Sequence, residues 1–391
     1  MKPELQIDQP NRYTVRMSWV RSGSNGERAL NILVLCCIRS FCSQVYTTER
    51  GFRGSLRTIP LAVFSVALFA LSSVCPVANA QDNAWTWYGG SSTLGSSGIV
   101  PAVYGTLGTS AAGNTPGSRA SAATWTDKSG NLWLFSGEVF AEYYNDLWMF
   151  NPSTAEWTWM GGSNADVPGH TGGVAGVYGT LGTPSAGNTA GGRLGAVTWS
   201  DGSGHFWMFG GYGFDSTGTA GFLNDLWEFN PATNQWTWMG GSSAVKCTEV
   251  IEATQCGQPG VYGAQGTPAT SNIPGGRENA VSWTDSKGNF WLFGGYGYDS
   301  NGTLRNLNDL WEFNPATSAW TWISGSTTVN HTNGQPGVYG VLGVPASGNM
   351  PGGRTKAVSW TDTKGNLWLF GGGNASTQGS LDFNDLWRYQ P

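Results

Sequence analysis

The sequence has few of the residues that most enzymatic sites require. Its 391 residues include only three histidines, and 12% of its residues are charged. It contains no Gly-x-Ser-x-Gly motif, no phosphate-binding glycine loop and no pair of histidines at metal-ligand spacing. The sequence therefore predicts no catalytic constellation, no metal site and no cofactor.

Positive charge is scarce outside the N-terminal part. The first 80 residues hold nine of the 20 Lys and Arg residues, so the rest of the chain has 11 basic and 21 acidic residues and no basic run. Nucleic acids and anionic membrane surfaces bind basic proteins. We therefore expect no nucleic-acid partner.

One hydrophobic run, from Ile59 to Val74, is short for a membrane-spanning helix. Arg53 and Arg57 precede it, and an Ala-x-Ala sequence that ends at Ala80 follows it. This pattern is typical of a secretory signal peptide, and a membrane anchor is the alternative. We expect an extension and signal peptide over 1–80, cleaved after Ala80. The mature domain, 81–391, is then secreted to the periplasm or outside the cell, without stable membrane insertion.

Only two cysteines, Cys247 and Cys256, lie beyond residue 80. An even number of cysteines in an exported protein favours a disulfide. Metal binding by this pair is less favoured, because no histidine or third cysteine lies nearby. The sequence predicts one disulfide that closes a loop of about ten residues, which stabilises the fold by roughly 2–3 kcal/mol.

The dominant feature is an internal repeat, which is the first property to look for in a sequence of this kind. Four landmarks each occur four times and in the same order. They are the Tyr of Val-Tyr-Gly (Tyr104, Tyr178, Tyr262, Tyr339), the Arg of Gly-Gly-Arg or Gly-Ser-Arg (Arg119, Arg193, Arg277, Arg354), the Trp of Asn-Asp-Leu-Trp (Trp148, Trp227, Trp311, Trp387) and the first Trp of Trp-Thr-Trp (Trp85, Trp157, Trp236, Trp320).

One repeat unit contains four short segments with the alternation and composition of strands. In the second unit these are 196–199, 205–211, 225–229 and 235–239, separated by turns rich in Gly, Asn, Pro and Asp. No helical stretch is present. The sequence therefore predicts an all-β chain of four-stranded antiparallel meanders.

These units resemble the kelch repeat. The resemblance is carried by "FGG" at the end of the second strand (209–211, 293–295, 370–372), by "NDLW" in the third strand and by "WTW" in the fourth. The first copy departs from it, with "FSGEVF" at 135–140. Kelch repeats form the blades of β-propellers, so the resemblance implies a propeller over 81–391.

The order of strands predicts how the ring closes. The mature chain begins with a fourth-strand copy, "AWTWY" (84–88), and the last unit has only three strands. We expect this N-terminal outer strand to complete the last blade, because the pairing removes two exposed sheet edges. The prediction is a monomer of four blades; a ring completed by a second chain is the alternative.

Twenty of the 21 tryptophans lie at repeat positions, five in each unit. Buried together at about 25 cal/mol per Å², they would contribute on the order of 100 kcal/mol of gross apolar burial, an upper bound. We expect them to pack between blades; exposed platforms for sugar rings are the alternative.

The long loops are predicted to form one functional face. The turns that join the first strand to the second and the third strand to the fourth are short. The loops between the second and third strands and between blades are long. Binding residues usually lie in such loops. The candidate binding residues are Tyr212, Phe214 and Asp215, with Tyr296, Tyr298 and Asp299 in the next copy. The alternative is that the repeated "GYGxDS" serves only as turn chemistry.

One Arg and one Asp recur in each unit and are expected to form structural pairs. An anion pocket lined by the four arginines is the alternative. The members are Arg119, Arg193, Arg277 and Arg354, and Asp146, Asp225, Asp309 and Asp385.

The kelch-like propellers include galactose oxidases, which use copper with imidazole and Tyr–Cys ligands. Here His170, His205 and His331 occupy unrelated repeat positions, so the resemblance does not carry that activity. Paired carboxylates for glycoside hydrolysis are a further possibility. The carboxylates that break the repeat are Glu138, Glu142, Glu278 and Asp382.

The favoured function is therefore an exported binding module whose long-loop face takes a protein or glycan. A carbohydrate-active or oxidising enzyme and a structural surface or matrix protein are the alternatives, since one fold serves many functions.

Overall fold

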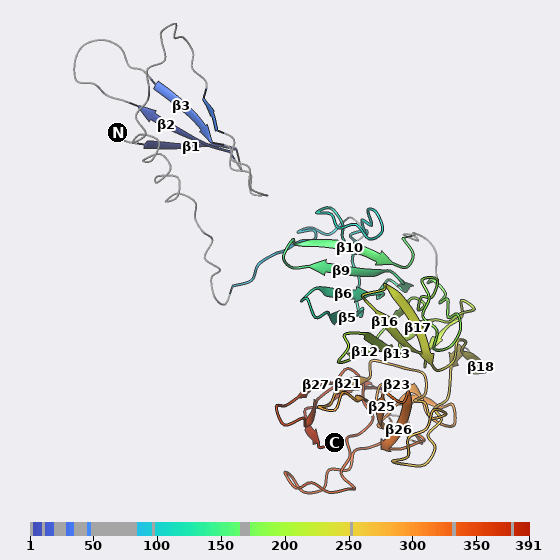
Figure 1. Ribbon diagram of the computed structural model, residues 1–391. Coiled ribbons are helices and arrows are strands. Elements are labelled where there is room, and N and C mark those ends of the chain that lie inside the picture. Colours follow the sequence, from blue (N-terminus) through green and yellow to red (C-terminus); the bar gives the residue numbers. More distant parts are fainter. Residues whose placement is uncertain are drawn as a thin grey trace, which may run out of the picture. The chain divides into compact units, whose positions relative to one another are not determined.

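The structure is a computed structural model, and it describes five segments: 3–9, 12–18, 29–34, 45–47 and 84–391. In the last of these, residues 96–97, 165–172, 251–252, 331–333 and 377–378 are not described. The chain divides into two compact units, Met1–Thr86 and Trp87–Pro391 (Figure 1). The predicted hydrophobic run at 59–74 and the cleavage site at Ala80 lie outside the described residues. Within the described residues, no helix has the length and hydropathy needed to cross a membrane.

The first unit contains one antiparallel sheet in the order β1-β2-β3-β4. Its strands are β1 (Pro3–Gln9), β2 (Arg12–Ser18), β3 (Ala29–Val34) and β4 (Val45–Thr47).

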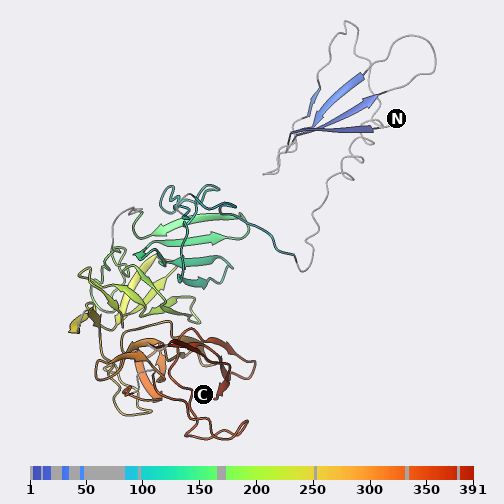
Figure 2. The ribbon, with the colours of Figure 1, turned by 180° about the vertical axis from the view of Figure 1, so that it is seen from behind.

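The second unit is built from four antiparallel sheets, which we number as blades 1 to 4 in chain order (Figures 1 and 2). Blade 1 consists of β5 (Ala123–Thr126), β6 (Leu132–Phe135), β9 (Leu147–Asn151) and β10 (Glu156–Gly161). Blade 2 consists of β12 (Val197–Ser200), β13 (Phe206–Phe209), β16 (Leu226–Asn230) and β17 (Gln235–Gly240). Blade 3 consists of β21 (Val281–Thr284), β22 (Phe290–Phe293), β25 (Leu310–Asn314) and β26 (Ala319–Ser324). Blade 4 consists of β27 (Val358–Thr361), β28 (Leu367–Phe370) and β31 (Leu386–Tyr389). Blades 1 to 3 are four-stranded meanders, so the predicted all-β class and blade architecture of a β-propeller are confirmed.

Short strands extend the blades on the side of the long loops. They form hairpins between the second and third main strands and ladders with the residues that follow each repeated Arg. They are β7 (Glu138–Val139), β8 (Glu142–Tyr143), β11 (Arg193–Leu194), β14 (Tyr212–Phe214), β15 (Ala220–Phe222), β20 (Arg277–Glu278), β23 (Tyr296–Tyr298), β24 (Leu304–Asn306), β29 (Gly373–Ser376) and β30 (Gly379–Asp382).

The cysteine pair lies in the hairpin of β18 (Lys246–Val250) and β19 (Ala253–Gly257). Cys247 and Cys256 face each other across the two strands and form a disulfide. Gly257 pairs in parallel with Phe222, so the hairpin joins the loop-side sheet of blade 2.

Tryptophans hold neighbouring blades together through a contact that recurs along the chain. The ring of Trp125 stacks on Phe206 of the next blade, with centroids 5.4 Å apart, and Trp199 stacks on Phe290 at 5.3 Å. The indole N–H of each then donates to a main-chain carbonyl of the next blade. The expected packing role of these tryptophans is therefore seen between blades, since burying both the ring and its N–H satisfies an amphipathic side chain.

Each blade also contains a buried ion pair. Arg119, Arg193, Arg277 and Arg354 contact Asp146, Asp225, Asp309 and Asp385 respectively, at 2.6–2.7 Å. In each pair both guanidinium NH2 groups donate to the two carboxylate oxygens, the bidentate geometry that arginine favours.

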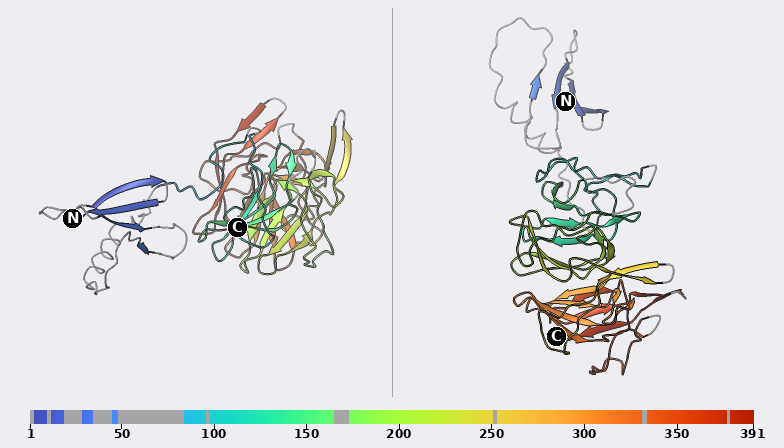
Figure 3. Two further views of the ribbon diagram at one scale, coloured as in Figure 1. Left: turned by 90° about the horizontal axis from the view of Figure 1, so that it is seen from above. Right: turned by 90° about the vertical axis from the view of Figure 1, so that its right-hand side faces the viewer.

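The predicted clasp between the two ends is not formed. Residues 84–88 belong to no strand, Trp87 of the second unit is exposed, and among the described residues no fourth strand pairs with β31. The physical reason is the arrangement of the blades: three like interfaces join blades 1 to 4 into an open arc, so blades 1 and 4 lie at opposite ends of the unit (Figures 1 and 3). Tyr88 instead packs on Phe150 of blade 1.

Candidate functional site

Two of the predicted binding residues shape their own loops. Asp215 is fully buried and its Oδ1 accepts main-chain N–H bonds from Thr217 and Thr219, while Oδ2 accepts one from Val245. Asp299 forms the same set of bonds one blade later. These carboxylates tie each long loop to the segment that follows the blade.

Phe214 and Tyr298 are also buried, against the chain of the neighbouring repeat. A Cβ on Gly173 would lie 2.4 Å from the Phe214 ring, and a Cβ on Gly257 would lie 2.1 Å from the Tyr298 ring, so both glycines permit this close packing. Of the six predicted residues, Tyr212 and Tyr296 therefore retain accessible surface, since each is half-buried.

Tyr212 and Tyr296 belong to a continuous row of aromatic rings on the loop side. The centroids of Tyr143 and Tyr212 are 5.9 Å apart, those of Tyr212 and Phe222 5.0 Å, and those of Phe222 and Tyr296 5.6 Å. The row crosses blades 1, 2 and 3. Tyrosines in such a row offer flat apolar faces and hydroxyl groups to the same ligand.

A main-chain belt lies beside this row, two residues after each repeated Arg. The amide of Gly195 donates to the carbonyl of Ser121, that of Asn279 to Gly195, and that of Lys356 to Asn279. All four residues have positive φ, between 53° and 63°. Three of them are not glycine, and residues held in this conformation cluster at functional sites because the surrounding structure must enforce it.

Charged residues that differ between blades gather at the same place. Glu278 directly precedes Asn279 of the belt and pairs with Tyr296 across the ladder of β20 and β23. Burial raises the pKa of Glu278, the neighbouring Glu138 adds to the rise, and Lys356 opposes it. Burial, with Tyr212, Glu138 and Glu278 nearby, raises the pKa of Tyr143 to about 12, so its hydroxyl remains a donor at neutral pH. We call Tyr143, Tyr212, Tyr296, Glu138, Glu278 and Lys356 the loop-side mouth.

Tyr212, Tyr296, Glu138 and Glu278 were predicted from the sequence as separate candidates, whereas Tyr143 and Lys356 were not predicted. A usable signal was present in the two residues after each repeated Arg, which read Ala-Ser, Leu-Gly, Glu-Asn and Thr-Lys in the four copies. These positions differ between blades although the Arg beside them does not, which makes them candidates for binding residues.

No similarity to known proteins identifies a family for this chain. No protein-family model matches the chain, and no curated protein matches it. The solved structure of YjhT aligns at 18% sequence identity and a TM-score of 0.37, covering 70% of this chain and 82% of that chain. The assignment of propeller blades therefore rests on the strand pairing described above.

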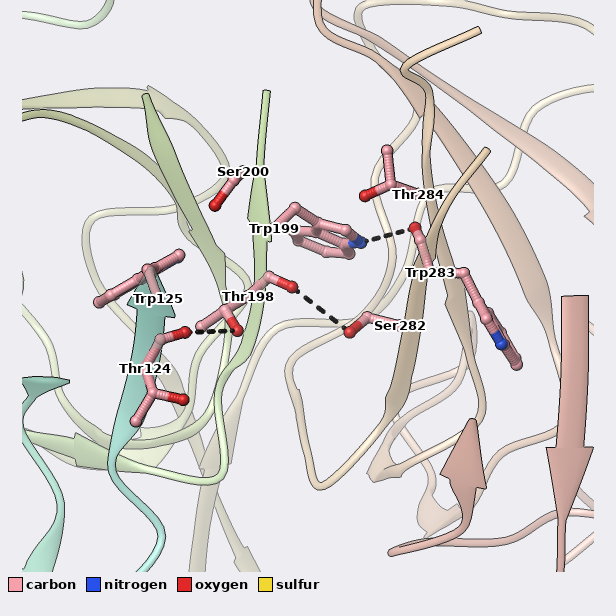
Figure 4. A pocket seen from close by; sticks show the side chains of 8 residues that line it. All are labelled: Thr124, Trp125, Thr198, Trp199, Ser200, Ser282, Trp283 and Thr284. Carbon is pink, nitrogen blue, oxygen red and sulfur yellow. Dashed lines mark hydrogen bonds between the residues drawn. The ribbon is translucent and has the colours of Figure 1, made fainter. Parts of the chain in front are cut away.

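A hollow of about 290 Å³ runs along the inner strands β5, β12 and β21 (Figure 4). Its walls carry hydroxyl groups, but these bridge the blades: Thr198 donates to the Thr124 carbonyl at 3.3 Å, and Ser282 to the Thr198 carbonyl at 3.4 Å. Trp199 points from β12 towards β21 in Figure 4, where its N–H reaches the carbonyl of Trp283. These hydroxyls contribute to blade registration.

One cluster in the described residues has the composition of a metal site, namely Asp201, His205 and Glu228 in blade 2. His205 contacts Glu228 and lies 3.6 Å from Asp201. In blade 3 the same position is Asn289, which bridges Asp285 and Glu312 by hydrogen bonds. The histidine thus replaces an amide that hydrogen-bonds to the equivalent carboxylates in blade 3. The prediction of no metal site stays a prediction.

Proposed function

We propose that this chain is an exported, kelch-repeat β-propeller binding module that takes a glycan at the loop-side mouth. The proposal of kelch type is supported by the "FGG", "NDLW" and "WTW" segments, which end the second strands and form the third and fourth strands of the blades. Export is supported by the hydrophobic run at 59–74 and by the Cys247–Cys256 disulfide, which forms in oxidising compartments.

The observation that carries the proposal is the row of half-buried tyrosines beside two carboxylates and one amine. Apolar faces of sugar rings pack on aromatic side chains, and sugar hydroxyls bond to carboxylate and phenol groups. Small-ligand sites combine such apolar walls with a few placed polar groups. The mouth offers both, and its polar groups come from different blades.

The test is binding to a glycan array by the full chain and by Tyr212→Ala and Tyr296→Ala variants. We expect a defined sugar to bind, and each variant to lose about tenfold or more in affinity, because buried aromatic contacts dominate such interfaces. Lys364→Ala, on the opposite side of blade 4 in a short turn, serves as the control and should bind normally. Unchanged binding in both tyrosine variants would place the ligand elsewhere.

Glu278 provides a prediction that does not depend on the ligand. Because its pKa in the folded state is raised above 4.5, ionising it destabilises the fold as the pH rises from 4.5 through that raised value. Glu278→Gln should therefore raise the melting temperature at pH 7 and leave it unchanged below pH 4.5. Thermal unfolding at the two pH values measures this, with Glu156→Gln in the outer strand of blade 1 as the control. An equal gain at both pH values would contradict the assigned burial of Glu278.

One observation favours a second candidate, hydrolysis of the bound glycan. A carboxyl with a raised pKa beside a second carboxyl is the pairing that glycosidases use as acid and base or nucleophile. Glu278 and Glu138 have this relation. If the sugar that binds is also cleaved, Glu278→Gln should abolish cleavage while binding persists. If the wild-type chain cleaves no sugar that it binds, hydrolysis is rejected and the function as a binding module is retained.

A further inference from the structure

The segment before blade 1 repeats the end of a fourth strand in its sequence and in its local hydrogen bonds. Its sequence from Trp85, "WTWYGGSS", differs at one position from "WTWMGGSS" at the end of blade 2. The indole of Trp87 donates to the carbonyl of Gly89, as Trp238 does to Gly240. The local bend is therefore that of a completed blade.

The same agreement continues through the next residues. Gly90 has φ +85°, and its equivalent Gly241 has φ +78°. Ser91 donates through Oγ to the carbonyl of Thr93 at 2.6 Å, as Ser242 does to Ala244 at 2.6 Å. A Cβ on Gly241 would meet Asn224 of blade 2 at 2.1 Å, whereas around Gly90 nothing lies within 4 Å. The bend after Trp87 therefore matches the bend after a paired fourth strand, although no third strand lies beside it among the described residues.

Among the described residues, blade 4 lacks a fourth strand beside β31. In blade 2 the outer strand accepts hydrogen bonds from Gly182 N–H and from the Asn188 amide, through Trp238 and Trp236 respectively. The equivalents in blade 4 are Gly343 and Asn349. Among the described residues, the side-chain amide of Asn349 keeps only the bond to Val344, and the Gly343 N–H has no acceptor.

The exposure of the repeated tyrosine also differs between blades 2 and 4. Tyr178 packs between the rings of Trp227 and Trp238 and is 5% exposed, whereas, among the described residues, the ring of Tyr339 packs on the ring of Trp387 alone and is 54% exposed. In the register of blade 2, Trp87 would face Trp387 and cover Tyr339.

The broad faces at the two ends of the arc also match. Val358, Trp360, Phe370 and Leu386 on blade 4 are exposed, although their equivalents in blades 1 to 3 are buried against the next blade. The opposite face of blade 1 carries the half-exposed Leu132 and Phe150, whose equivalents Phe206 and Phe229 in blade 2 receive such a face.

We propose that a second copy of this chain completes blade 4. Residues 84–88 of one copy pair with β31 of the other, and the face around Trp360 packs on blade 1 of the copy that supplies the strand. In blades 1 to 3, the chain that follows each fourth strand forms the next blade, and that next blade packs on the blade just completed. When residues 84–88 of one copy pair with β31 of the other, blade 1 of the first copy therefore packs on blade 4 of the second. The interface is thus continuous with three that already exist in the fold.

We expect this contact to form between two molecules, because blades 1 and 4 of one chain lie at opposite ends of the unit. Its two ends lie apart in the structure (Figure 3), and the interfaces of blades 1 with 2 and of blades 2 with 3 share the same stacked Trp–Phe geometry. A head-to-tail contact between copies is heterologous, so two or more copies close a ring when the rotation allows it.

The test uses facing positions in the proposed ladder. By the register of Glu228 with Thr237, Arg388 faces Thr86. Full-length Thr86→Cys and Arg388→Cys chains, carrying different tags, are co-expressed, oxidised mildly and digested for mass spectrometry. We expect a disulfide-linked peptide pair that joins the substituted positions of the two tagged chains, and a multimer by light scattering of the wild type.

Two further variants separate the proposal from its competitors. Trp360→Glu should weaken self-association about tenfold or more, because a central tryptophan usually dominates an interface. Leu181→Glu, which changes an equally exposed leucine outside both faces, should leave it unchanged. A third chain that carries both Thr86→Cys and Arg388→Cys is expressed alone and oxidised in the same way. A cross-link within this chain, with none between the two singly substituted chains, would show closure within one chain and overturn the proposal. A monomeric wild type without the cross-link would also overturn it.

Discussion

Asp309→Asn is expected to destabilise the protein by about 3–5 kcal/mol, since it leaves the guanidinium of Arg277 charged and buried without a counter-charge. Both side chains are almost inaccessible, and the carboxylate also accepts hydrogen bonds from Trp311 and Tyr262 at 2.7 Å. The loss is measured by urea unfolding of the full chain at pH 7, followed by tryptophan fluorescence.

The loss of stability caused by Asp309→Asn is expected to depend on pH. Burial alone would raise the pKa of Asp309, but the ion pair and hydrogen bonds outweigh it and lower that pKa below 3.8. The stabilisation is therefore present above pH 3.8 and is lost as the pH falls through the lowered value. The difference between wild type and Asp309→Asn should shrink in acid. A constant difference would mean that the variant acts through shape and not through charge.

Asp385→Asn is the matched control in the open blade. Asp385 makes the same pair with Arg354, but its side chain is 15% exposed and the covering Tyr339 is open to water. Water can solvate the charge that this variant leaves behind, so we expect a smaller loss of about 1–3 kcal/mol. Equal losses at the two positions would indicate that Asp385 is covered in solution.

Local features of this fold were predictable because the repeat presents them several times. The alternation in "HFWMFGG" and "NDLWEFN" predicts strands, and the structure has β13 and β16 at these places. The pairing of Arg193 with Asp225 follows from one charge of each sign in every unit. In these cases the physical cause lies within a single blade or between neighbours, where the sequence pattern records it.

The clasp was predicted from strand counting and is absent, because closure depends on the angle between blades. That angle results from the stacking of Trp125 on Phe206 and Trp199 on Phe290, which a sequence pattern does not specify. The loop-side mouth was missed for a related reason. Tyr143 and Lys356 are more than 200 positions apart, and only the arc of blades brings their loops to one belt.

Trp199→Ala is expected to cost about 3–5 kcal/mol, whereas Trp360→Ala at the equivalent position should cost less than about 1 kcal/mol in the isolated chain. Trp199 is 4% exposed, stacks on Phe290 and donates its N–H to Trp283, so its removal leaves a cavity between blades 2 and 3. Trp360 is 54% exposed and forms no such stack among the described residues.

The contrast between these variants depends on protein concentration. At low concentration the chain is an isolated arc, and removing Trp360 takes away a side chain that is already largely hydrated. Self-association stabilises the folded state by mass action, so the cost of Trp360→Ala should rise with concentration while that of Trp199→Ala stays constant. Urea unfolding at two protein concentrations a hundredfold apart measures both. A cost for Trp360→Ala that is large at every concentration would mean that its ring is buried within one chain, as closure of the four blades on themselves requires.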